Sequence, residues 1–269
     1  MLDRFLGGVP VLVRFLTLAL LIGGLIGGVA NFLLLAGYWP WEMPPLAHRF
    51  LSGAATAYVV GALITLTRRR WAESELLMVT VVIYGILLVG AVLLQPTLLD
   101  WSSGITWAFV GVVTPALAIS IGYLWSMRDK ASVETVQTLS PTLRTYLLVV
   151  GILALAVGTL VFVAPKQSGL IWPWAALDVW KLLDSRLIAC MLLTIAGGAF
   201  WARWRNERGV ARLFLAMLFA YCVVADIGLA LHAAATPAFL AADLVYVGIF
   251  AVVVVVGALL YPRGSTSRS

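Results

Sequence analysis

A single aspartate lies inside a long apolar segment of this sequence. Asp226 stands about halfway along residues 213–233, which contain no other Asp, Glu, Lys or Arg. Placing a carboxylate at the centre of a bilayer costs about 2.5 to 3.5 kcal/mol on insertion scales. We therefore expect Asp226 to be protonated or hydrogen-bonded. Two interpretations remain, a structural hydrogen bond or a site for a proton or substrate.

Two arginines occupy matching places in the sequence. Arg49 and Arg186 each end an L-x-x-R motif. A guanidinium group binds a carboxylate or phosphate through two parallel hydrogen bonds, so the pair is a candidate for binding an anion. The alternative is that each arginine reaches the lipid headgroups, or pairs with Asp184 or Glu42.

A further group of polar residues falls near the ends of apolar segments. Asp243 precedes residues 244–262, and His232, Gln95 and Asp100 are expected at the same side of the membrane. Together these groups predict an outer half-channel. The candidate substrate or proton site consists of Asp226, Asp243, Arg49 and Arg186.

The segments that carry these residues are strongly apolar. Of 269 residues, 62% are hydrophobic and 11% are charged, against roughly a quarter charged in soluble domains. A helix needs about 20 apolar residues to cross about 30 Å of hydrocarbon. Seven segments without charge are long enough, namely 15–41, 50–67, 76–99, 101–127, 145–165, 187–202 and 244–262. With residues 213–233, the sequence predicts an all-α integral membrane protein with eight transmembrane helices.

The basic residues predict the orientation. Fourteen of the eighteen Lys and Arg fall on the side of the membrane that holds both termini, and four fall on the other side. The positive-inside rule then places both termini in the cytoplasm, for a chain in the cytoplasmic (inner) membrane. The positive charge is explained by topology, so we expect the lipid bilayer as a partner and no nucleic acid.

Parts of the sequence recur. The W-P-W motif at 39–41 returns at 172–174, and Tyr84 matches Tyr221 at the same offset of 137 residues as the two arginines. The tryptophans favour either an interfacial belt or the lining of an outer vestibule. Because each copy has an even number of helices, the copies should be parallel and related by a two-fold axis along the membrane normal.

This repeat defines the predicted domains. They are a four-helix repeat at 11–127, a cytoplasmic linker at 128–141, a second four-helix repeat at 142–262 and a disordered tail at 263–269.

The repeated motif resembles one found in bacterial integral membrane proteins of uncharacterised function. The resemblance is carried by Trp39, Pro40, Trp41, Leu46 and Arg49, and again by Trp172, Pro173, Trp174, Leu183 and Arg186. It implies no reaction and no ligand.

A glycine-rich run lies within the first apolar segment. Residues 23–28, G-G-L-I-G-G, contain two overlapping GxxxG spacings. No strand precedes them, so they predict a face for close helix packing and not a phosphate-binding loop.

The remaining sequence lacks the motifs of known catalytic or metal centres. It contains no HExxH, no GxSxG and no Cys/His cluster, and only two histidines. We therefore expect no cofactor and no metal, and an integral-membrane enzyme is the third class of function after the two that follow. The predicted function is that of a non-catalytic membrane subunit or scaffold, with other membrane subunits as partners. The alternative is a small-solute or proton-coupled secondary transporter, because of the duplication and the buried acid.

Overall fold

The computed structural model is built of helices. It describes residues 10–35, 41, 43–68, 71–98, 101–127, 138–176 and 182–261. The long helices are α2 (Val11–Phe32), α3 (Pro45–Arg68), α4 (Trp71–Leu93), α5 (Gly104–Met127), α6 (Pro141–Val163), α7 (Leu182–Arg205), α8 (Arg208–Ala235) and α9 (Leu240–Leu259). Short 3-10 helices are η1 (Pro96–Leu98), η2 (Gln167–Leu170), η3 (Pro173–Ala176) and η4 (Pro237–Phe239).

The structure bears on the predicted domain boundaries at two places. α2 begins at Val11, where the first repeat was expected to start. α6 begins at Pro141, one residue before the predicted start of the second repeat, because the Ser140 side chain accepts a hydrogen bond from the backbone N–H of Leu143 and caps the helix. Residues 128–137 of the predicted linker and the predicted tail at 263–269 lie outside the described residues.

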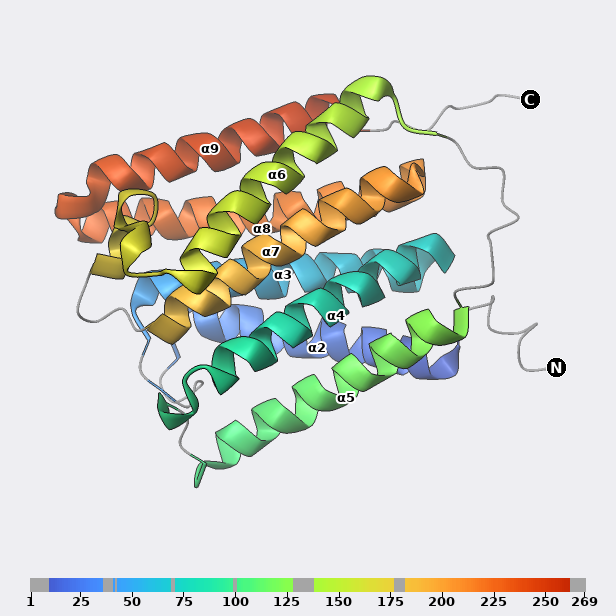
Figure 1. Ribbon diagram of the computed structural model, residues 1–269, viewed down its shortest axis with the longest axis horizontal. Coiled ribbons are helices and arrows are strands. Elements are labelled where there is room, and N and C mark those ends of the chain that lie inside the picture. Colours follow the sequence, from blue (N-terminus) through green and yellow to red (C-terminus); the bar gives the residue numbers. More distant parts are fainter. Residues whose placement is uncertain are drawn as a thin grey trace.

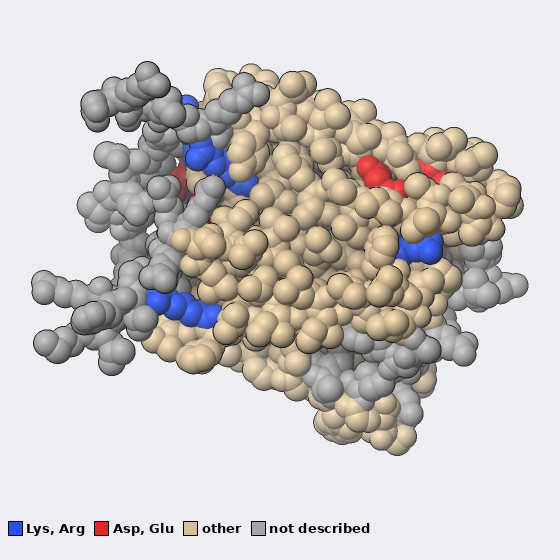
Figure 2. Space-filling view, turned by 180° about the vertical axis from the view of Figure 1, so that it is seen from behind, with Lys and Arg blue, Asp and Glu red and all other residues tan. Residues whose placement is uncertain are grey.

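The helices have the length and composition of membrane spans. Seven of them are long and apolar enough to cross a membrane, namely α2, α3, α4, α6, α7, α8, and α9 together with η4. α5 contributes a shorter apolar stretch, Val110–Ser126. Figure 2 shows one face of the molecule, where uncharged side chains cover a broad band between charged groups toward the two ends. The chain is an all-helical, polytopic membrane protein in the part that the structure describes.

The helices form two layers. Contacts run in the order α2, α3, α8, α9 through one layer and α5, α4, α7, α6 through the other. Figure 1 shows the second layer in front of the first. The layers touch through their middle members, since α3 and α8 each contact α4 and α7, and also at one edge, where α2 contacts α5.

Glycines allow close approach within these layers. A Cβ at Gly24 would lie 3.1 Å from the Ala55 carbonyl oxygen of α3, and one at Gly28 would lie 3.6 Å from the Ala55 Cβ. The predicted packing face is therefore confirmed for these two glycines. By contrast, a Cβ at Gly23 would meet nothing within 4 Å.

One end of the bundle is held by charged groups around the turn from α7 to α8. Asn206 adopts a left-handed backbone conformation with φ 55° and accepts a hydrogen bond from the Leu139 N–H at 3.3 Å. Arg205 lies 3.3 Å from Glu75 of α4 and 2.9 Å from Glu207. These contacts join α4, the residues before α6 and the α7–α8 turn. We call this the arginine end, defined by Arg203, Arg205 and Arg208.

Candidate functional site

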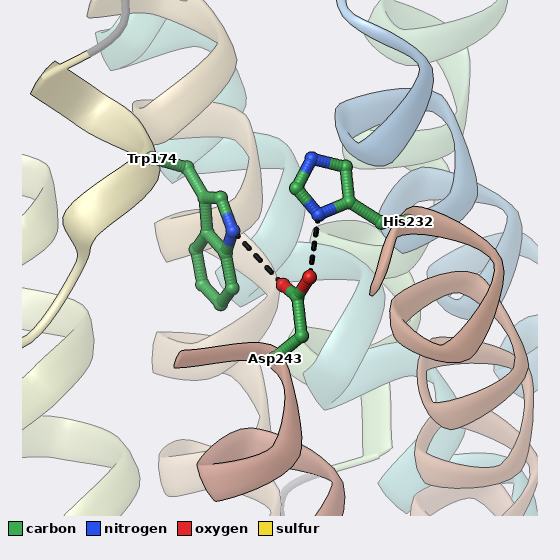
Figure 3. A network of polar contacts seen from close by, with 3 residues as sticks. All are labelled: Trp174, His232 and Asp243. Carbon is green, nitrogen blue, oxygen red and sulfur yellow. Dashed lines mark hydrogen bonds and ion pairs between the residues drawn. The ribbon is translucent and has the colours of Figure 1, made fainter. Parts of the chain in front are cut away.

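The opposite end of the bundle gathers aromatic and acidic side chains. We call it the tryptophan end, defined by Trp41, Trp172 and Trp174. There the Trp174 indole Nε1–H donates to Asp243 Oδ1 at 3.1 Å, and His232 Nδ1 lies 2.7 Å from Asp243 Oδ2 (Figure 3). The Asp243 side chain is fully buried.

Three separate segments supply this network. Trp174 belongs to η3, His232 to the last turn of α8, and Asp243 to the first turn of α9. The partial positive charge of a helix N-terminus stabilises an acid, and the partial negative charge of a C-terminus stabilises a protonated histidine. Pro237 begins η4 and brings the chain from α8 back into α9. The local sequence therefore favours an acid and a histidine at these two places.

Aromatic packing fixes the indole of Trp174. Its ring centroid lies 4.8 Å from that of Trp172, 4.9 Å from that of Tyr246 and 6.1 Å from that of Phe50. The Tyr246 hydroxyl donates to the carbonyl of Ile171. Trp172 and Trp174 are buried in the bundle. These two tryptophans therefore pack inside the bundle, enclosed by Phe50 of α3 and Tyr246 of α9, and of the two interpretations a lipid-facing belt does not fit them.

Asp243 also holds the ring of His232. A carboxylate accepts more than one hydrogen bond, so Asp243 can accept from the Trp174 indole at Oδ1 and from Nδ1–H of His232 at Oδ2. The second ring nitrogen points away from Asp243 (Figure 3). Within the described ranges, no group of three or more His, Cys, Asp or Glu could hold a metal ion.

A second tryptophan–carboxylate pair lies at the same end. Trp41 Nε1–H donates to Asp184 Oδ1 at 2.9 Å, and the Asp184 side chain is fully buried in the first turn of α7. Sequence reasoning considered Asp184 only as a partner for arginine. The repeated W-P-W motif gave no signal for this pair, because at the offset of 137 the residue matched with Asp184 is Ala47.

The two candidate arginines differ in their surroundings. Arg186 Nε donates to the carbonyl of Phe162, in the last turn of α6, at 3.1 Å. Arg49 is partly exposed, and its Nε is buried with no hydrogen-bond partner among the residues that the structure describes. The sequence also suggested that the arginines pair with Asp184 or Glu42. Asp184 bonds Trp41, and Glu42 lies outside the described residues.

Asp226 lies apart from the network at the tryptophan end. It is partly buried on α8, six residues before His232, which corresponds to about 9 Å along the helix. Its Oδ1 is buried and makes no hydrogen bond within the described part of the chain. The structure therefore brings together Asp243 and His232 of the predicted polar group and leaves Asp226 separate. Gln95 follows α4 in the other layer, and Asp100 is outside the described residues.

Comparison with known proteins gives no family. No family model, curated protein or solved structure matches this chain.

The geometry therefore has to be interpreted from its own contacts. The hydrogen bonds of Asp243 join η3, α8 and α9, and that of Asp184 joins Trp41, which precedes α3, to α7. Buried polar networks with satisfied partners make a structure rigid. Asp226 takes no part in this network, and its Oδ1 is buried without a hydrogen bond in the described structure.

Proposed function

We propose that the protein is a non-catalytic membrane subunit or scaffold that has other membrane subunits as partners. The observation that carries this proposal is that Asp184 and Asp243 are bonded within the chain. Each is fully buried and accepts a hydrogen bond from a tryptophan of the same chain. Carboxylates bound in this way fasten segments of a rigid bundle, whereas a carrier needs polar groups that can face a solute.

In this proposal the chain has eight spans, α5 being the eighth, arranged as two parallel four-helix repeats at 11–127 and 142–262. The pattern of helix contacts supports the repeat. In the repeat, α2, α3, α4 and α5 correspond to α6, α7, α8 and α9. The contact of α2 with α3 then corresponds to that of α6 with α7, and the contact of α4 with α5 to that of α8 with α9. The contact of α3 with α8 corresponds to that of α7 with α4. A two-fold axis along the membrane normal would exchange the members of each pair.

Contacts between single residues agree with the same symmetry. A Cβ at Gly53 of α3 would lie 3.1 Å from the Tyr221 carbonyl oxygen of α8. Adding or subtracting 137 converts Gly53 to Cys190 of α7 and Tyr221 to Tyr84 of α4. Cys190 and Tyr84 also belong to one hydrophobic cluster. The repeated motif that resembles uncharacterised bacterial membrane proteins belongs to this framework.

The orientation follows from the basic residues. Arg203, Arg205 and Arg208 gather at the arginine end, and the positive-inside rule favours that end for the cytoplasm. We therefore propose that the protein resides in the cytoplasmic (inner) membrane with both termini in the cytoplasm and the tryptophan end outside.

A crosslinking experiment tests the subunit proposal. The span formed by η4 and α9 is the least buried of the candidate spans. A photo-crosslinking amino acid at Leu244, which is 58% exposed, should give one discrete adduct with another membrane polypeptide in native membranes. The same group at the buried Ile188 of α7 is the matched control and should give none. Adducts with lipid alone at several positions along α9 would contradict the proposal.

A second candidate, a proton-coupled transporter of a small solute, is favoured by Asp226. Ionisable groups are rare within membrane spans, and those present commonly belong to functional sites. The Oδ1 atom of Asp226 is buried without a hydrogen bond in the described structure. A proton can bind there without breaking an existing contact.

Reconstitution separates the two candidates. The purified chain in liposomes with a trapped pH-sensitive dye should move no protons if it is a scaffold. Asp226→Asn keeps the size of the side chain but removes its ionisation. Proton flux by the chain alone that is lost in Asp226→Asn would overturn the scaffold proposal and support the transporter.

A further inference from the structure

Arg49 is held in a fixed place at the tryptophan end. It lies in the second turn of α3, against Gly228 of α8. A Cβ added to Gly228 would lie 2.8 Å from the Arg49 Cβ and 3.5 Å from its Cδ. Glycine at this position therefore lets the arginine side chain lie against α8.

The guanidinium of Arg49 has no counter-charge in the described structure. Its Nε is buried, and no described residue accepts a hydrogen bond from it or forms an ion pair with it. A buried donor on a charged group is costly when it is unpaired, and such a group in a native protein calls for an unseen water or ion. The partner of Nε has to accept a hydrogen bond, and an anion would in addition neutralise the charge of the guanidinium.

Arg186 shows what a satisfied arginine looks like in the same motif. Its Nε donates to the Phe162 carbonyl at 3.1 Å. Both arginines end an L-x-x-R motif, and both lie near the start of a helix that begins at the tryptophan end. Arg49 therefore differs from Arg186 in having an Nε without a hydrogen-bond acceptor in the described structure. Because both arginines share the motif, the motif does not explain this difference.

The depth of Arg49 indicates which anion can reach it. α3 has 24 residues and is about 36 Å long, which exceeds the roughly 30 Å of hydrocarbon. Arg49 lies about 6 Å from the start of the helix, close to the boundary between hydrocarbon and headgroups. A side chain as long as that of arginine can reach the level of lipid phosphates from this depth by snorkelling. A phosphate accepts two parallel hydrogen bonds from guanidinium.

We propose that Arg49, supported by Gly228, binds a phosphate oxyanion at the membrane surface, supplied by the headgroup of an anionic phospholipid or by free phosphate. The site is independent of whether the protein is a subunit or a transporter. It would anchor the α3–α8 pair at the level of the headgroups.

Lipid binding to the purified full chain tests this site. Phosphatidylglycerol is titrated into detergent-solubilised protein, and bound lipid is counted by native mass spectrometry. Arg49→Gln should weaken the tightest binding by about tenfold or more, since hydrogen bonds to a charged group are lost. The matched control, Arg186→Gln, should retain the affinity of the unmodified protein. Equal affinity in Arg49→Gln, or an equal loss in both variants, would overturn the proposal.

Two further arms identify the source of the phosphate and guard against misfolding. If inorganic phosphate at millimolar concentration displaces phosphatidylglycerol, free phosphate shares the site; if it does not, the lipid is the ligand. Gly228→Ala keeps the charge of Arg49 but displaces its side chain. It should weaken lipid binding while the helical circular dichroism signal is unchanged, and unaltered binding in this variant would also contradict the proposed geometry.

Discussion

The hydrogen bond between Trp174 and Asp243 provides a quantitative test of the tryptophan end. Trp174→Phe removes the indole donor but keeps an aromatic ring against Phe50 and Tyr246. Asp243→Ala removes the acceptor of both Trp174 and His232. The double variant completes a cycle that isolates the energy of the single tryptophan–aspartate contact.

The magnitude follows from the surroundings of the bond. Asp243→Ala leaves two donors without their acceptor, at about 1 to 3 kcal/mol each. His232 is 12% exposed and recovers part of this from water, so we expect a loss of about 2 to 4 kcal/mol in the free energy of unfolding. Hydrogen bonds to charged groups contribute about 1.5 to 3 kcal/mol, but those measured within membranes average about 0.6 and reach about 1.7. For a fully buried carboxylate we expect a coupling energy of about 1 to 1.5 kcal/mol.

Unfolding by sodium dodecyl sulfate in mixed micelles measures these energies, with helix content followed by circular dichroism. The pair Trp41→Phe and Asp184→Ala should give a similar coupling energy, because the bond is 2.9 Å long and equally buried. The crossed pair Trp41→Phe and Asp243→Ala shares no bond and should be additive. Single effects of Trp174→Phe and Asp243→Ala that add within about 0.3 kcal/mol would refute the assigned role of the bond.

Three other expectations can be tested on the same protein. Gly24→Leu should destabilise the bundle by about 1 to 3 kcal/mol because the side chain meets the backbone of α3, whereas Gly23→Leu, which faces open space, should change stability little; equal losses would contradict the packing face. Asp226→Leu should leave the unfolding free energy unchanged or raise it by about 1 kcal/mol, since a buried unpaired oxygen is removed; a loss above about 1 kcal/mol would reveal a partner. A cysteine at the exposed Thr142 should react with impermeant maleimide only from the cytoplasm and one at Ala238 only from outside, both native cysteines being buried; the reverse pattern would invert the topology.

The helices were largely predictable from the sequence because the membrane restricts the choice. A backbone in hydrocarbon has to satisfy its own hydrogen bonds, so an apolar segment of sufficient length becomes a helix. The starts of α2 at Val11 and of α6 at Pro141 agree with that reasoning. The glycine face of α2 was also predictable, since small residues at GxxxG spacing mark close packing.

The partners of the polar residues were not predictable in the same way. Trp41 and Asp184 are 143 residues apart in the sequence, and Trp174 and Asp243 are 69 apart. Their contact depends on how separate helices dock, which no local pattern encodes. The belt interpretation of the tryptophans failed for the same reason. An indole has an apolar body and one donor, so an interface and a buried acid satisfy it equally well, and only the fold decides between them.

In the proposed repeat, Arg49 and Arg186 are matched with different residues at one position of α8 and α4. The offset of 137 that relates Arg49 to Arg186 relates Ala91 of α4 to Gly228 of α8. A Cβ at position 228 would collide with the Arg49 side chain, so a glycine is needed for the arginine to lie along the helix. Ala91, the residue at the matched position, carries that Cβ and is fully buried, and Arg186 bonds the carbonyl of Phe162. In the proposed repeat, one methyl group thus separates an arginine that bonds within the chain from one whose Nε has no partner in the described structure, a difference that the L-x-x-R motif does not contain.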